Sequence, residues 1–253
     1  MLQKNLESLD NEVKEVLNIF IEKYLEDPNL HGILLTGSYA IGDASKNSDL
    51  DVHLIFKDLE WRERGNTWIN GYEIEYFINP ENQIYEYFRT EDPLRPNSVH
   101  MFANGIVLFT KPESSVLTNL IKKAKILIDT PLNNMSETDV EMAKYYIDDV
   151  YKDLKDLILE KNDIAYQITA GELLKYCIDL FFKINRTIKE KNKRIPKQLL
   201  NIDEKFYYII QKVIKSHFDI VEVKKLVNYS ENSLKGRRTL EWKLKSNLRI
   251  IKN

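Results

Sequence analysis

The sequence predicts an α+β protein in which a small mixed β-sheet with flanking helices is followed by an α-helical bundle. The main observation is the uneven placement of the residues that form turns. Of the 253 residues, eight are glycine and seven are proline; six glycines lie at or before Gly105 and six prolines at or before Pro131. The first half therefore has the many short connections of a mixed fold, whereas the second half can form long helices.

Hydrophobic patterning places two helices and four strands in the first half. Apolar residues recur at helical spacing from Leu6 to Tyr24, and the pattern ends before Asp27-Pro28. Short apolar or alternating runs followed by turn residues predict strands. We expect the strands at residues 31–36, 50–56, 72–78 and 105–109, and a second helix near residues 81–90.

From about Ser114 onward the apolar spacing is helical. The helices expected there are residues 116–128, 137–159, 165–189, 203–216 and 221–234, with a final one indicated by Trp242, Leu244 and Leu248. We place the domain boundary near residues 110–132. Residues 1–112 are taken as the first domain and residues 113–253 as the second.

Charge and composition exclude several classes of protein. The chain has 37 basic and 39 acidic side chains, and its net charge of −2 disfavours nucleic-acid binding by bulk electrostatics. The single cysteine, Cys177, excludes an internal disulfide framework and a cysteine-built zinc site. The N-terminal residues MLQKNLESLDNEV are too polar for a signal peptide, and no apolar run reaches the ~20 residues of a membrane span. We expect a cytoplasmic protein with no membrane partner.

The residues that point to chemistry lie between positions 36 and 75. Gly37 follows a predicted strand and opens a short helix, where a glycine lets the backbone approach a ligand and free N–H groups can meet a phosphate. Ser38 adds a hydroxyl donor at the same place. Asp49 and Asp51 alternate with apolar residues, so their carboxylates share one face of a strand.

A second acidic pair, Glu73 and Glu75, repeats this arrangement in the third predicted strand. Adjacent carboxylates repel each other unless a cation lies between them, and Mg²⁺ is the cation that oxygen ligands and nucleotide phosphates favour. If the two acidic strands are neighbours, one of these glutamates completes a three-carboxylate site with Asp49 and Asp51. We favour Glu75, and the pattern leaves Glu73 open.

Two runs in this region resemble a known signature. Leu35-Thr-Gly-Ser-Tyr-Ala-Ile-Gly-Asp, followed by Asn47-Ser-Asp-Leu-Asp-Val, is similar to the signature of the polymerase-beta-type nucleotidyltransferase superfamily, especially the antibiotic and minimal nucleotidyltransferases. The resemblance covers about residues 30–110, and the helical remainder resembles the C-terminal bundle of aminoglycoside nucleotidyltransferases in layout. It implies a nucleotidyltransferase domain over residues 1–112 and a helical, acceptor-binding domain over residues 113–253.

The resemblance also implies roles for individual residues. Gly37 and Ser38 would hold the β- and γ-phosphates of a nucleoside triphosphate, ATP being the commonest donor in this branch. Asp49, Asp51 and Glu75 would bind two Mg²⁺ ions, which stabilise the attacking and leaving oxygens when an acceptor hydroxyl displaces pyrophosphate. This chain has a glutamate at the third position, where many members have an aspartate.

Two further candidates lie in the helical half. In the aminoglycoside enzymes a carboxylate facing the acceptor serves as general base, and Glu172, flanked by small residues, is our candidate for that role. Its alternative is a solvated position on an amphipathic helix. Lys197 begins a helix after Pro196 and can reach a triphosphate, with a surface lysine as the alternative.

Three functions compete on this basis. The first is an adenylyltransferase that modifies a small hydroxylated molecule, an aminoglycoside-type antibiotic or alternatively a lincosamide, and so confers antibiotic resistance. The second is a regulatory, antitoxin-like nucleotidyltransferase that modifies a protein or tRNA, and the third is a non-catalytic nucleotide-binding module. We favour the first, because cationic aminoglycosides suit an acid-rich cleft and the helical half is sizeable. A monomer and a homodimer are both compatible with the sequence.

Overall fold

The computed structural model describes residues 9–239, 241 and 243. The chain divides into two compact units, residues 1–130 and residues 131–253. The boundary expected between residues 112 and 113 precedes a helix that packs within the first unit. Leu6, Trp242, Leu244 and Leu248, on which part of the helix prediction depended, lie outside the described residues.

The first unit alternates helices and strands, as predicted. Its elements are α2 (Asn11–Leu25), β1 (Leu30–Thr36), α3 (Gly37–Ala40), β2 (Leu50–Phe56), β3 (Glu63–Ile69), β4 (Tyr72–Pro80), α4 (Glu81–Thr90), α5 (Asn97–Ala103), β5 (Ile106–Thr110) and α6 (Val116–Asp129). The four strands and two helices expected here are all present, within one or two residues for the strands.

The five strands form one mixed sheet in the order β3-β4-β2-β1-β5. Strand β1 is antiparallel to both β2 and β5, and β3 is antiparallel to β4. The central pair β2 and β4 is parallel. The two acidic strands are thus neighbours, which is the condition for a three-carboxylate site, and their pairing decides which residues lie side by side.

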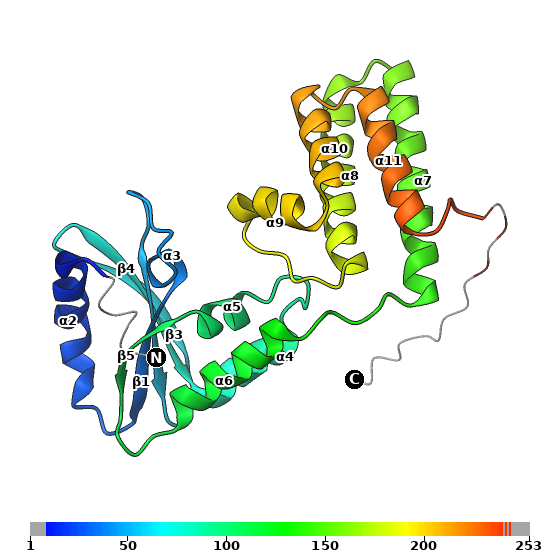
Figure 1. Ribbon diagram of the computed structural model, residues 1–253. Coiled ribbons are helices and arrows are strands. Elements are labelled where there is room, and N and C mark those ends of the chain that lie inside the picture. The colour runs from blue at the N-terminus through cyan, green and yellow to red at the C-terminus, as the bar shows by residue number, and fades with distance from the viewer. Residues whose placement is uncertain (1–8, 240, 242, 244–253) are drawn as a thin grey trace. The chain divides into compact units, whose positions relative to one another are not determined.

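Helices cover both faces of this sheet (Figure 1), because apolar residues alternate along the strands. Ile33 and Leu35 pack on the α2 face with Val16 and Phe20. Leu34, between them in sequence, packs on the opposite face with residues of α4, α5 and α6. The central strands β1 and β2 are therefore buried on both faces, whereas the edge strand β3 has no buried residue.

Strand β3 and helix α5 were missed by the sequence prediction. Strand β3, with the sequence ERGNTWI, is polar and mostly exposed, since it lies at the edge of the sheet. The turn that joins it to β4 is Asn70-Gly71, with positive φ at both residues. Asn-Gly between two extended runs is a strong hairpin signal, so this strand could have been predicted from its turn.

The second unit is helical. Its elements are α7 (Glu137–Leu159), α8 (Asp163–Ile184), η1 (Asn192–Arg194), α9 (Ile195–Ile202), α10 (Glu204–Lys215) and α11 (Ile220–Ser233). Phe206 of α10 links three helices, because its ring stacks on Phe181 of α8 at 4.3 Å and on Tyr229 of α11 at 4.7 Å. Cys177 is buried in the same unit.

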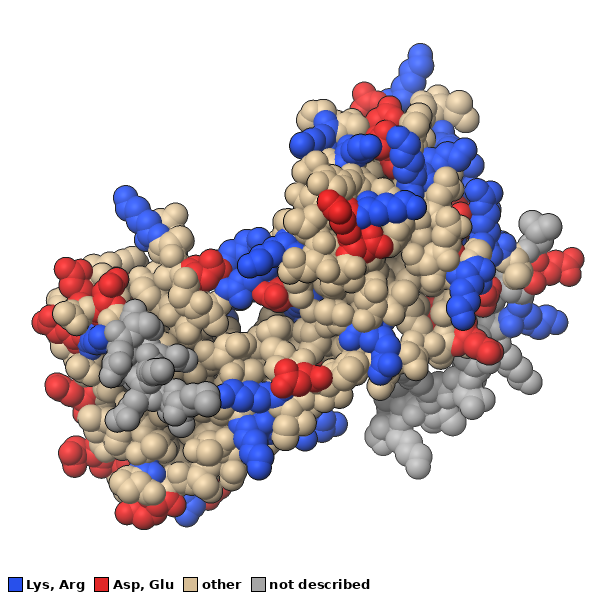
Figure 2. Space-filling model, in the orientation of Figure 1, with Lys and Arg blue, Asp and Glu red and all other residues tan. Residues whose placement is uncertain are grey.

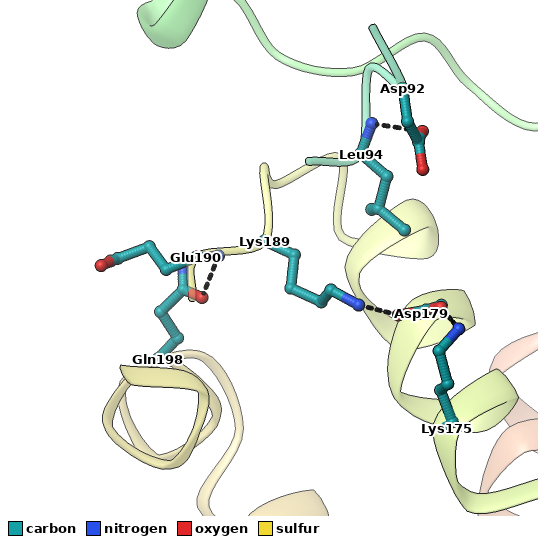
Figure 3. Close-up of polar contacts among 7 residues, drawn as sticks. All are labelled: Asp92, Leu94, Lys175, Asp179, Lys189, Glu190 and Gln198. Carbon is teal, nitrogen blue, oxygen red and sulfur yellow. Dashed lines mark hydrogen bonds and ion pairs between the residues drawn. The ribbon is translucent and has the colours of Figure 1, made fainter. Parts of the chain in front are cut away.

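The prediction that a helix continues to residue 189 is wrong. Helix α8 ends at Ile184, and Arg186 has a φ of 54°, which a right-handed helix cannot contain. An ion pair between Lys189 and Asp179 holds the segment that follows to α8 (Figure 3). Asp179 also forms an ion pair with Lys175. Lys189 is only 6% exposed and Asp179 is partly exposed, so the lysine is the buried member of this ion pair.

Charges of both signs cover the helical unit. On the face drawn in Figure 2, its lysine and arginine side chains are interspersed with aspartates and glutamates. Among the described residues, none of the helices combines the length and apolar character needed to traverse a membrane.

Candidate functional site

The parallel pairing of β2 and β4 brings three carboxylates together. Asp51 of β2 lies directly opposite Glu75 of β4, and Asp49 immediately precedes β2 on the same face. One oxygen from each of these residues lies within 4.8 Å of the others. Asp51 is buried, at 7% exposure, whereas Asp49 and Glu75 are partly exposed. The sheet therefore presents a compact acidic cluster where its central strands β2 and β4 begin.

These three residues fit a hard divalent cation. Mg²⁺ binds carboxylate oxygens at about 2.1 Å, so two oxygens on one ion lie at most about 4.2 Å apart. The spread of 4.8 Å requires only a small side-chain movement to reach that limit. Asp49, Asp51 and Glu75 are the residues that would hold the ion.

Glu75 also has a partner on the edge strand. Both Nε and Nη2 of Arg64 donate to the same oxygen of Glu75, Oε1, with the Nε contact at 2.7 Å. An arginine that faces a carboxylate usually engages both oxygens. Here Oε2 receives no hydrogen bond among the described residues, so it is available to a cation.

The geometry distinguishes Glu75 from Glu73, which the sequence left open. Glu73 lies two residues before Glu75 on β4, so it is not the residue opposite Asp51. Its carboxylate accepts a hydrogen bond from Nδ2 of Asn66 at 2.8 Å. Among the described residues, the three-carboxylate group contains Glu75 and not Glu73. The preference for Glu75 thus has a geometric basis in the register of the sheet.

Gly37 lies against the acidic cluster. Its φ is +69°, and a Cβ atom at this position would lie 1.8 Å from Oδ2 of Asp51. Only glycine satisfies both the left-handed conformation and this close approach. Ser38 follows in the four-residue helix α3. Strand β1 therefore ends with its Gly-Ser turn beside the carboxylates of β2, as the motif predicts.

His53 lies further along the same face of β2. Its ring stacks on Phe77 of β4 at 4.7 Å and meets the edge of Phe102 of α5 at 5.2 Å. The residue is 5% exposed, and neither ring nitrogen has a hydrogen-bond partner among the described residues. Burial lowers the pKa of His53 to about 4, so the imidazole is neutral near pH 7.

The two other sequence candidates lie in the second unit. Glu172 is exposed on α8, and Lys197 is exposed in the first turn of α9. Their predicted roles as general base and nucleotide contact remain predictions. Arg64 was missed by sequence reasoning because the strand that carries it was missed.

A comparison with models of protein families identifies a known domain in this chain. A model of the nucleotidyltransferase domain family matches residues 13–108. Among solved structures, the chain is similar to a nucleotidyltransferase-like protein from Exiguobacterium sibiricum 255-15, with 14% identity, a TM-score of 0.48, and coverage of 87% of this chain and 76% of that chain. A search of curated proteins finds no match.

The matched range includes the Gly-Ser turn, the acidic cluster and the strands that carry them. It confirms the resemblance that the motifs predicted. The chain thus contains a nucleotidyltransferase domain of the polymerase-beta type.

Proposed function

We propose that this protein transfers a nucleoside monophosphate, AMP from ATP, to a hydroxyl group of a small molecule in a Mg²⁺-dependent reaction. The observation that supports the proposal is the convergence of Asp49, Asp51 and Glu75 beside Gly37, inside a domain that matches the nucleotidyltransferase model. A three-carboxylate cluster next to a Gly-Ser turn suits a metal-bound triphosphate.

In the proposed reaction, the acceptor oxygen forms a bond to the α-phosphorus while the bond from that phosphorus to the β-bridging oxygen breaks. Pyrophosphate leaves, and the hydroxyl proton passes to a base, for which Glu172 is our candidate. Gly37 and Ser38 would contact the leaving phosphates and leave room for them. When bound, Mg²⁺ would neutralise charge on the transferred and leaving phosphate groups. The chain's main contribution is to hold the reactants in line.

Aminoglycosides are the first acceptors to test, because the motifs resemble those of antibiotic nucleotidyltransferases, and lincosamides are the second. The experiment measures Mg²⁺-dependent pyrophosphate release from ATP with each compound. Asp49→Asn serves as the control. Release that depends on the acceptor and is lost in the variant would support the proposal.

Other outcomes would change the acceptor that we assign or refute the proposal. If no small molecule supports release while Mg-ATP still binds, the acceptor is a protein or an RNA, as in the regulatory alternative. Absence of nucleotide binding would refute the proposal. Glu172→Gln tests the base separately, because an unchanged rate would remove Glu172 from that role.

A further inference from the structure

A cavity of about 520 Å³ adjoins the acidic cluster within the first unit. Glu75 belongs to both, since it lies in the cluster and also lines the cavity. The cavity extends from Glu75 along β3 and β4 and beneath α4 and α5, with His53 and Phe77 among its lining residues. A molecule bound here would reach the third carboxylate directly.

The carboxylates around this cavity are already engaged. Glu63 pairs with Ile78 across the strands and accepts a hydrogen bond from Tyr76 at 2.9 Å, so its charge lies toward the α2 face of the sheet. Glu91 accepts hydrogen bonds from both the backbone N–H and the hydroxyl of Ser98, at 2.8 and 2.6 Å. Both carboxylates keep their negative charge, because hydroxyl and N–H donors are neutral, and both line the cavity.

The cations around the cavity are less well compensated. Arg62 donates to the hydroxyl of Tyr87 at 2.6 Å, and it makes no ion pair among the described residues. Arg64 is paired with Glu75. A divalent cation at the acidic cluster would compensate the charge of Glu75, and Arg64 would then add its positive charge to that of Arg62. Arg62 and Arg64 would then form a positive side of the cavity, while Glu63 and Glu91 carry the negative charge of its lining.

The order of strands gives this cavity a place in the proposed reaction. The strands β1, β2, β4 and β3 lie side by side in that order. The Gly-Ser turn follows β1, the two aspartates lie on or beside β2, and Glu75 lies on β4. The cavity lies along β4 and β3. In-line displacement requires the nucleophile and the leaving group on opposite sides of the phosphorus. With the leaving phosphates at Gly37, the nucleophile must approach from the side of the cavity.

We propose that this cavity binds the acceptor, and that the acceptor is a hydroxylated molecule carrying an anionic group, a phosphate or a carboxylate, which Arg62 recognises. The inference rests on the proposed nucleotidyl transfer and narrows its acceptor class. On the side of the cavity that Arg62 and Arg64 form, the amino groups of an aminoglycoside would meet two like charges.

The test compares three ligands that share a sugar ring: glucose 6-phosphate, glucose and glucosamine. Binding is measured by calorimetry with Mg²⁺ and a non-hydrolysable ATP analogue present. We expect the phosphorylated sugar to bind at least about tenfold more tightly than the other two, because its phosphate would accept a charge-assisted hydrogen bond from Arg62. Arg62→Gln should abolish this preference.

Arg89→Gln is the matched control, because Arg89 is also exposed, pairs with Glu86 on α4 and does not line the cavity. It should bind all three sugars as the wild type does. Equal binding of the three sugars by the wild type, or a preference that persists in Arg62→Gln, would overturn the proposal. If Arg62→Gln weakens binding of the ATP analogue instead, Arg62 contacts the donor phosphates and the assignment to the acceptor is wrong.

The transfer itself is measured separately, by pyrophosphate release from ATP with sugar phosphates and hydroxy acids as acceptors. Release that requires an anionic acceptor supports both proposals. A binding preference that depends on Arg62, without release from any acceptor, would refute the transfer and uphold the anion site. Release with aminoglycosides alone would uphold the transfer and refute the anionic acceptor.

Discussion

The close approach of Gly37 to Asp51 yields a sharp prediction. In Gly37→Ala the new Cβ would lie 1.8 Å from Oδ2 of Asp51, whereas ordinary contact begins at 3.4 Å. The carboxylate must therefore move by about 1.6 Å, the difference between these two distances. Displacing a reacting or ligating group by about 1 Å can cost about 10²-fold in rate. We expect a loss of at least that size in transfer, together with weaker Mg²⁺ binding.

The chain offers a matched control in Gly42. Its φ is also +69°, but a Cβ there would have no neighbour within 4 Å. Both alanine variants should lose about 1–2 kcal/mol of stability from the left-handed conformation. For a protein of this size, that is a decrease of about 2–8 °C in Tm. The conformational cost is shared by the two variants, so any further difference between them reports the contact with Asp51.

The assays are thermal unfolding, calorimetric titration of the protein with Mg²⁺ and pyrophosphate release from ATP. Gly42→Ala should retain the metal affinity and transfer rate of the wild type. The reasoning would be refuted if Gly37→Ala bound Mg²⁺ and turned over within about threefold of Gly42→Ala. The glycine would then be a requirement of the turn and not of the acidic cluster.

Three other expectations follow from charge and burial. Asp49→Asn should abolish transfer yet leave the Tm of the metal-free protein unchanged or slightly higher, because it removes repulsion within the acidic cluster; a clear decrease in Tm would contradict this. Asp179→Asn should lower the free energy of unfolding of the helical unit by about 3 kcal/mol, because it leaves the buried Lys189 without its charged partner. Lys175→Met should cost less than about 1 kcal/mol, because Lys175 is exposed. Denaturant unfolding measures both variants, and equal losses of stability would contradict this reasoning. Burial raises the pKa of the Cys177 thiol to about 12, so little of it is thiolate, the reactive form, at pH 8. Its reaction with a disulfide reagent at pH 8 should therefore be about 10³-fold slower than that of a free thiol. Rapid labelling of the native protein would refute this.

Much of the site could be predicted because its signal is local. Gly37 and Ser38 end a buried strand, and Asp49 and Asp51 alternate around the start of the next one. Strand periodicity places the two aspartates on one face without reference to the rest of the chain. The same local patterning predicts the helices of the second unit, although it extends the one that ends at Ile184.

The third carboxylate needed more than local pattern. Glu73 and Glu75 share a face of β4, and sequence periodicity treats them alike. The register of the parallel pair places Glu75 opposite Asp51, and a shift of two residues would have exchanged the two glutamates. Such a register depends on how β4 packs against β2 and on the hairpin with β3, which are contacts between distant parts of the chain.

The sequence by itself determined the class of the fold, the Gly-Ser turn and the Asp-x-Asp strand, because turn chemistry and side-chain alternation are properties of short segments. Only the tertiary structure decided that Glu75 joins the aspartates, that Gly37 leaves no space for a side chain, and that Arg62 and Arg64 border a cavity next to Glu75. These features arise because β3, β4, β2 and β1, which are separated along the chain, are neighbours in the sheet in that order. The charge of a cavity is the sum over residues that only folding brings together.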